Sequence, residues 1–156
     1  MNKEAVSFLF DRMLGKTCRK MRLLGFDAVM NPEGETGRFL LNAQKEGRIA
    51  VTRARRRGFR PGPDPIIIES DATRDQIVEL LKKLNMPPSF KPFTRCLECN
   101  TVLVDARPDD VNGKVPVHVA ETFKEFYRCP TCGRIYWKGT HFEAMSREIE
   151  KIAEAF

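Results

Sequence analysis

Long hydrophobic runs are missing from this sequence, and so are several motifs that identify common enzyme classes. No apolar segment approaches the roughly 20 residues that a membrane-spanning helix requires. The sequence has no glycine-rich nucleotide-binding loop and no internal repeat, and neither of its two histidines belongs to a Ser–His–Asp or Cys–His pattern. No long apolar region follows Met1 to Glu4. We therefore expect no signal peptide, no membrane partner and a cytoplasmic protein.

Negative charge is in deficit. The 156 residues include 27 Lys and Arg but only 21 Asp and Glu, which gives a net charge of +6. This balance is a weak indication of a polyanionic partner such as nucleic acid. The basic residues gather in two stretches, which are Lys16, Arg19, Lys20 and Arg22, and Arg53, Arg55, Arg56, Arg57 and Arg60.

Cysteine is scarce, but its pattern is informative. Four of the five cysteines form two CxxC pairs, Cys96 with Cys99 and Cys129 with Cys132. Two such pairs supply the four ligands of tetrahedral zinc, with Zn–S distances of about 2.3 Å. Two disulfides or a redox dithiol are the alternatives, and the reducing cytosol disfavours disulfides. Four thiolates leave no open position for water, so we expect structural zinc, with Cys18 as a core residue.

Hydrophobic periodicity predicts an α/β fold. We expect strands at 6–10, 26–30, 48–52 and 65–69, and helices at 12–24, 36–46, 73–84 and from 140 onwards. This order of elements is typical of an open parallel sheet flanked by helices. The unbroken isoleucines of the fourth strand indicate burial on both of its faces. Capping boxes are predicted at Thr73–Gln76 and Thr140–Glu143.

Changes in composition divide the chain. We expect an α/β domain at 1–88, a linker at 89–94, and a cysteine-bearing module with a C-terminal docking helix at 95–156. The apolar stripe of the last helix is the face that we expect to dock on the α/β domain. Residues 116–126 fit either a short helix or an extended segment.

Asp11 stands at the carboxyl end of the first predicted strand. Sites in open α/β sheets lie outside the carboxyl ends of the strands, where carboxylates can hold Mg²⁺ or Mn²⁺ for phosphodiester cleavage. Glu35 and Thr52–Arg53 reach the same edge. The alternative for a lone strand-end aspartate is a helix N-cap. The basic face of the helix that follows, which begins with Arg12 and Lys16, is either a phosphate contact or a solvated surface.

Several segments together carry a resemblance to one known family: 8–16, 22–28, 46–49, 51–53, 95–100 and 129–141. They are similar to the Mut-seven C-terminal RNase family, in which a PIN-like domain is fused to a zinc ribbon. The resemblance spans nearly the whole chain and is most specific around the cysteines. It implies a PIN-like three-layer α/β/α nuclease fold, a structural zinc ribbon, and RNA cleavage that depends on a divalent metal such as Mg²⁺ or Mn²⁺.

The match is incomplete at the acids that would hold this second metal. Asp11 matches the family's first acid, but Ala54 stands where the family has the aspartate of a Thr-Arg-Asp sequence. The acidic pair that opens the second helix falls on residues 36–37, which are Thr and Gly. Glu35 is one position away, and Asp71 is a further candidate.

This departure leaves three functions open. The first is an RNA-binding protein with an incomplete catalytic set, because guanidinium groups bind phosphates and repel a metal cation. The second is an active ribonuclease that uses Asp11 with Glu35 or Asp71. The third is a zinc-ribbon adaptor that binds a protein partner through its ribbon and terminal helix. The sequence favours the first, with RNA contacts at Arg12, Lys16, Arg53, Arg55, Arg56 and Arg57.

Overall fold

A four-stranded parallel sheet lies at the centre of the larger part of the molecule. The computed structural model describes residues 5–31, 36–55 and 63–156. The strands are β1 (Ser7–Phe10), β2 (Asp27–Met30), β3 (Ile49–Thr52) and β4 (Ile66–Ile67), in the spatial order β2-β1-β3-β4. The central strand β1 pairs in parallel with both β2 and β3. The predicted α/β fold with a parallel sheet is therefore confirmed.

Helices cover both faces of this sheet because its central strand alternates. Phe8 and Phe10 of β1 point into a core formed with α1 (Gly15–Leu23) and α3 (Thr73–Lys83). Leu9 points to the opposite face and packs against α2 (Thr36–Glu46). Successive side chains of a strand face opposite sides, so three apolar residues in a row serve two cores. The sheet is thus the middle of three layers.

Two elements differ from their prediction, one in how its helix begins and one in how far its strand is buried. The helix expected from residue 12 begins as a 3-10 turn, η1 (Arg12–Leu14), because Leu14 N donates to Asp11 O (3.1 Å) before α1 continues. The fourth strand was expected to be buried on both faces, and this is wrong. β4 lies at the edge of the sheet, where Ile66 and Ile67 are only partly buried.

Both predicted capping boxes are also wrong. Helix α3 begins after Ala72 and has no side-chain cap, because the buried Gln76 is used elsewhere. Its amide accepts a hydrogen bond from Thr17 of α1 and donates to the carbonyl of Ser70 (3.0 Å). Helix α6 (Thr140–Ala153) begins after Gly139 and likewise has no side-chain cap.

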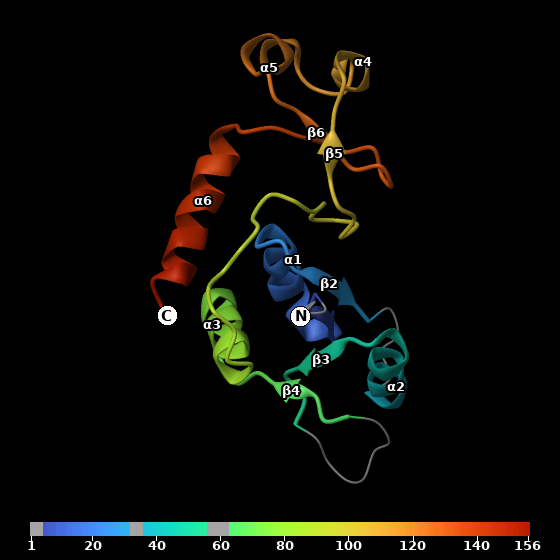
Figure 1. The fold of residues 1–156 in the computed structure, drawn as a ribbon, viewed down its shortest axis with the longest axis vertical. Helices are drawn as coiled ribbons and strands as arrows, with labels where there is room; N and C mark the ends of the chain where they lie inside the picture. The colour runs from blue at the N-terminus through green and yellow to red at the C-terminus, as the bar shows by residue number, and fades with distance from the viewer. Residues whose placement is uncertain (1–4, 32–35, 56–62) are drawn as a thin grey trace.

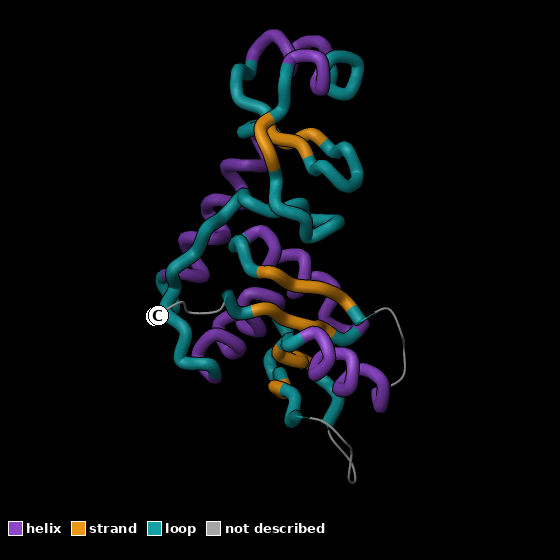
Figure 2. Tube along the Cα trace, turned by 45° about the vertical axis from the view of Figure 1, so that its right-hand side comes forward, coloured by secondary structure: helices purple, strands orange, loops and turns teal. Residues whose placement is uncertain are grey.

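A smaller antiparallel sheet forms the other part of the molecule. Its strands are β5 (Val104–Asp105), β6 (Tyr127–Arg128) and β7 (Ile135–Tyr136). Two short helices, α4 (Pro108–Val111) and α5 (Val117–Thr122), lie between β5 and β6. Residues 116–126, which fitted two conformations, thus contain a short helix followed by an extended run into β6. Figure 2 shows the strands of the two sheets as separate groups.

Helix α6 returns from the small sheet to the side of α3 (Figure 1). Its Ile152 is 1% exposed and belongs to the core beneath α1 and α3. Glu148 of the same helix bridges Lys20 of α1 (2.9 Å) and Arg74 of α3 (3.1 Å). The apolar stripe of this helix therefore meets the α/β part of the molecule. Among the described residues, no helix has the length and apolar character needed to cross a bilayer.

The segment that joins the two parts lies against the end of α1. Lys91 N donates to Leu24 O (3.0 Å), and Phe93 N donates to Leu23 O (3.1 Å). Gly25 has a φ of +94°, and a Cβ built on it would lie 2.2 Å from the carbonyl oxygen of Lys91. Both the backbone conformation and the close approach require glycine here.

Candidate metal centre and sheet-edge site

The two CxxC pairs form two knuckles, 96–101 and 129–134, with the same backbone scheme. In each, the N–H of the first cysteine donates to the residue five positions later, and its carbonyl accepts from the residue four positions later. The distances are 2.8 Å (Cys96 N to Thr101 O), 2.9 Å (Asn100 N to Cys96 O), 2.9 Å (Cys129 N to Arg134 O) and 2.9 Å (Gly133 N to Cys129 O). The residue after each second cysteine has a positive φ, 66° at Asn100 and 76° at Gly133.

These knuckles bring four sulfur atoms together. All four Sγ atoms lie within 4.8 Å of one another. The Sγ atoms of Cys96 and Cys132 are 3.8 Å apart. Tetrahedral ligands at a Zn–S distance of about 2.3 Å place their sulfurs about 3.8 Å apart, so the spacing fits one ion. The predicted ligands Cys96, Cys99, Cys129 and Cys132 are therefore together and could hold a metal ion such as zinc.

Hydrogen bonds act on the sulfur atoms unequally, since the neighbouring Cys132 raises the pKa of the Cys99 thiol whereas backbone donors lower that of Cys129. Cys132 N donates to the sulfur of Cys129 (3.5 Å), and Cys99 N donates to that of Cys96 (3.4 Å). Burial alone would raise the pKa of the Cys129 thiol, but the backbone N–H groups of Cys132 and Thr131 lower it to about 6. A thiolate is the form that binds a metal. By contrast, burial raises the pKa of Cys18 to about 11, and this residue is a core thiol as predicted.

Tyr136 was not foreseen as part of this centre. Its hydroxyl lies 3.1 Å from the sulfur of Cys96 and accepts a hydrogen bond from Leu97 N (3.2 Å). The strand β7 that follows the second knuckle thus supports the first. Burial raises the pKa of this phenol above its ordinary value, so the hydroxyl is available as a neutral donor. The one signal in the sequence was its position directly after the second knuckle.

Arg22 attaches the first knuckle to the α/β part. Its Nε donates to Ala28 O of β2 (2.7 Å), and its Nη1 donates to Leu97 O and Glu98 O (2.9 Å each). Only 9% of the residue is exposed. Arg22 therefore does not belong to the free basic face that was expected on α1. Its guanidinium group instead donates hydrogen bonds to three backbone carbonyl groups.

Asn100 makes the matching attachment from the knuckle side. Its Oδ1 accepts from Ala28 N (3.0 Å), and its Nδ2 donates to Asp27 Oδ1 (2.7 Å). Asp27 also pairs with Arg48 (2.6 Å). Because β2 is an edge strand, Arg22 and Asn100 together bind both backbone polar groups of Ala28 that a further strand would need.

Asp11 lies at the carboxyl edge of the parallel sheet, and its carboxylate is occupied by three donors. They are Met13 N (2.9 Å), the hydroxyl of Thr52 and Arg53 N (3.2 Å). The first of these bonds makes Asp11 the N-cap of η1, which was the alternative to a catalytic role. The other two tie β1 to the end of β3.

The other candidate acids do not join Asp11 in the described structure. The side chain of Asp71 is 93% exposed and pairs with Arg53 Nη2 (2.6 Å). Ala54 is exposed, and Glu35 lies outside the described residues. Within the described part of the chain, the four cysteines are the one group of three or more His, Cys, Asp or Glu residues close enough to hold a metal ion.

The candidate RNA contacts occupy different environments. Arg12, Lys16 and Arg55 are exposed, whereas Arg53 is partly buried and bound to Asp71. Arg56 and Arg57 lie outside the described residues. The three other members of the basic stretch on α1 are engaged, since Arg19 pairs with Glu98, Lys20 pairs with Glu148 and Arg22 binds carbonyls.

Comparison with known proteins and families shows to which family the chain belongs. A search of the curated proteins gives no match, and a search of the solved structures gives none. The model of the Mut7-C RNAse domain family matches residues 6–149. This match includes the parallel sheet, both knuckles and most of α6. The chain therefore belongs to the Mut7-C RNAse domain family.

Proposed function

We propose that this protein binds RNA at the carboxyl edge of its parallel sheet and has an incomplete catalytic set. The environment of Asp11 carries the proposal. Its carboxylate accepts three hydrogen bonds, and the partners include the backbone of Arg53. Arg12 and Lys16 follow Asp11 closely in the sequence, Arg55 follows Arg53, and all three side chains are exposed. Guanidinium and ammonium groups bind phosphate oxygens, and the family's association with RNA suggests which polyanion they meet.

Cleavage needs more than Asp11 offers. A PIN-like nuclease uses several carboxylates at this edge, but Ala54 has no oxygen, and Asp71 is bound by Arg53. An active ribonuclease that uses Asp11 with Glu35 or Asp71 is the second candidate. The observation that favours it is the location of Asp11, which follows β1 directly at the edge where α/β enzymes place their sites.

The cysteine centre is proposed to hold structural zinc in a cytoplasmic protein. Four thiolates close the coordination sphere, so the ion has no position for a reacting water. The spacing of the sulfurs supports one tetrahedral ion. Such an ion stabilises the ribbon, which then serves as a rigid body beside α1.

The binding proposal is tested with fluorescent single-stranded RNA over a range of salt concentrations. We expect log K to fall linearly with log salt, by about 0.7 for each phosphate contact. The Arg12→Gln, Lys16→Gln double variant should bind more weakly and with a smaller slope. Lys45→Gln on α2 removes an exposed charge from the opposite face and should have no effect. Binding that does not depend on salt would instead support a protein-adaptor function.

The question of cleavage has its own experiment. The parent protein and Asp11→Asn are each incubated with the same RNA and Mn²⁺, and their products are separated by size. We expect no cleavage by either protein. Cleavage by the parent that the variant lacks would establish the ribonuclease reading. Thermal unfolding of the variant checks that any loss of activity is not a loss of fold.

A further inference from the structure

A groove of about 580 Å³ lies beside the second knuckle, and Cys132 and Tyr136 of the metal centre form part of its wall. We call it the ribbon groove, and the lining side chains that offer charged or aromatic contacts to a ligand are Arg19, Glu98, Lys114, Arg134, Tyr136 and Trp137. These side chains come from α1, the first knuckle, the insert between α4 and α5, and the segment around β7. The groove is therefore formed only when the ribbon is docked on α1.

Cationic side chains outnumber acidic ones among the residues that line this groove. Lys114 and Arg134 are both exposed, and in the part of the chain that the structure describes neither side chain has a hydrogen-bonding or ion-pair partner. Arg19 pairs with Glu98, whose carboxylate is the only acid among the lining residues. The charged side chains that line the groove are thus three cations and one acid, and the metal centre contributes Cys132 to the same lining. The cationic side chains offer contacts to an anionic ligand.

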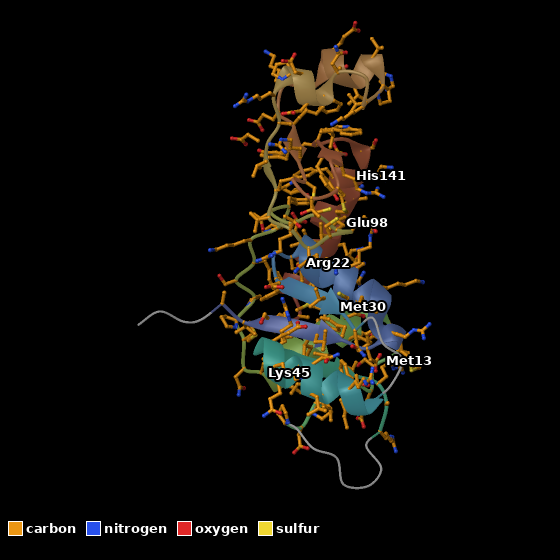
Figure 3. The ribbon with its side chains drawn as sticks, turned by 90° about the vertical axis from the view of Figure 1, so that its right-hand side faces the viewer. Met13, Arg22, Met30, Lys45, Glu98 and His141 are labelled. Atoms are coloured by element: carbon orange, nitrogen blue, oxygen red, sulfur yellow. The ribbon has the colours of Figure 1, made fainter. Side chains whose placement is uncertain are left out.

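A line of cations connects the ribbon groove to the sheet edge. Lys16 and Arg19 are three residues apart on α1 and are both exposed, so they share the face opposite the buried Thr17, Cys18 and Met21. Arg12 precedes them in η1. From Arg12 to Arg19 the chain advances about 10 Å along the helix axis. Figure 3 shows Met13, Arg22 and Glu98 in this order along the long axis of the molecule.

We propose that the ribbon groove is a second RNA-binding site, and that one single-stranded RNA runs from the sheet edge along α1 into it. This inference rests on the proposed function, because it extends the same ligand to a new surface. The phosphates contact Arg12, Lys16 and Arg19 and then Lys114 and Arg134. A separate small anion would not use cations that extend along a helix for this distance.

The aromatic side chains of the groove favour a single strand over a duplex. Tyr136 and Trp137 are partly exposed in the same wall as Arg134. Unpaired bases can stack on such rings, and each stacked base contributes about 1–3 kcal/mol. In an A-form duplex the bases are stacked on one another and cannot do this.

Glu98 limits binding at the entrance of the groove. Its ion pair with Arg19 is partly exposed, with 39% and 53% of the two side chains accessible. Pairs of this kind contribute about 0–1 kcal/mol, so a phosphate can replace the carboxylate. Removal of this acid should free Arg19 for RNA.

The experiment measures the affinity of the full-length, metal-loaded protein for a fluorescent single-stranded RNA. The Lys114→Gln, Arg134→Gln double variant should bind at least about tenfold more weakly near 0.1 M salt, with a salt slope smaller by about 1.4. Glu98→Gln should bind a few fold more tightly. Lys45→Gln, on the far face of the sheet, is the control and should match the parent. Metal content and thermal unfolding are measured for each variant.

The outcomes separate this inference from the proposed function. If the double variant and Glu98→Gln both bind like the parent while Arg12→Gln, Lys16→Gln binds weakly, the ribbon groove is not a binding site and the sheet-edge site stands. If the parent itself binds no RNA, both proposals fail. Equal affinity for a blunt duplex of the same length would overturn the assignment of a single strand.

Discussion

The two knuckles have the same backbone bonds but different surroundings. The first, 96–101, is fixed to the α/β part by Arg22 and Asn100, and its Cys99 is partly buried. The second, 129–134, carries the exposed Cys132 and lines the ribbon groove. One half of the metal centre therefore fixes the ribbon to the sheet, and the other half remains accessible to a ligand.

A single pair of residues expresses this difference. Asn100 and Gly133 occupy the same position of their knuckles and have similar positive φ values, 66° and 76°. Glycine adopts this conformation without steric cost, and asparagine is among the few other residues that tolerate it. Asn100 also gives the knuckle a side chain that binds β2. The same backbone turn is thus used once for shape alone and once for shape and attachment.

Metal removal should have the largest effect, because it acts on both knuckles together. We expect a strong chelator to unfold residues 95–140 and to leave β1 and β3 folded, since their core does not include the four ligand cysteines. Structural zinc contributes about 10–16 kcal/mol to small zinc domains at neutral pH. Amide hydrogen exchange followed by mass spectrometry locates the change. Unaltered protection of 95–140 after complete loss of metal would show that the ion is not structural.

The next effect is expected from Arg22→Met, which acts on the first knuckle only. Methionine keeps the apolar part of the side chain but leaves the carbonyls of Ala28, Leu97 and Glu98 without their donor. Hydrogen bonds from charged groups contribute about 1.5–3 kcal/mol, and the three here are not additive, so we expect a loss of about 3 kcal/mol. Urea unfolding measures it.

Arg19→Met is the matched control for this change. It removes an arginine three residues earlier on the same helix, but its partner Glu98 is on the surface. We expect a loss below about 0.5 kcal/mol. Equal losses for the two variants would mean that the attachment at β2 does not stabilise the protein. Metal content should remain unchanged in both.

Two single substitutions, each of which gives one knuckle the turn residue of the other, test the comparison more sharply. Asn100→Gly keeps the positive φ but loses the bonds to Ala28 and Asp27, at an expected cost of about 2 kcal/mol. Gly133→Asn places asparagine in the same conformation where a Cβ has no neighbour within 4 Å, and should cost less than about 1 kcal/mol. Thermal unfolding ranks the two variants. The reverse order would mean that backbone conformation, and not attachment, distinguishes the knuckles.

The sequence predicted the local features of both sites better than their connections. The CxxC spacing and the glycine after the second pair identified the metal centre, because knuckle geometry depends on adjacent residues. The N-cap role of Asp11 could likewise be predicted from the residues next to it. Arg22 was different, since periodicity placed it on the basic face of the helix, where solvent or a phosphate was the expected contact. Two of its three acceptors lie 75 and 76 positions away along the chain, and only the folded structure brings them to it.

The capping box expected at Thr73–Gln76 failed for a similar reason. Spacing gave Gln76 a partner three residues away, but in the fold its amide meets Thr17 of α1. Sequence patterns describe what a side chain can do near itself. Competition from a distant partner in a buried environment decides the outcome. The acids of the sheet edge show this limit as well, since Asp71 is near Arg53 in space and binds it.

The smallest effect is expected at a second attachment, where α6 at the end of the chain meets α1 and α3. Glu148 of α6 accepts hydrogen bonds from Arg74 and Lys20, and these cations lower its pKa to about 2. A depressed folded-state pKa means that the stabilisation is present above the ordinary value of about 4.5 and is lost as the pH falls towards 2. Because these two ion pairs are partly exposed, we expect them to stabilise the folded protein by about 1 kcal/mol at neutral pH.

Glu148→Gln should therefore be less stable than the parent at pH 7, and the difference should shrink below pH 4.5 and vanish only below the folded-state pKa of about 2. Glu150→Gln, on the exposed side of the same helix, controls for the loss of a charge. The attachment made by Arg22 uses carbonyl acceptors, which do not titrate, so the loss in Arg22→Met should stay constant over the same range of pH. Urea unfolding at several pH values measures both. If the two losses changed with pH in the same way, the ionic and the carbonyl attachments would not be distinct, and the first knuckle would owe its stability to charge.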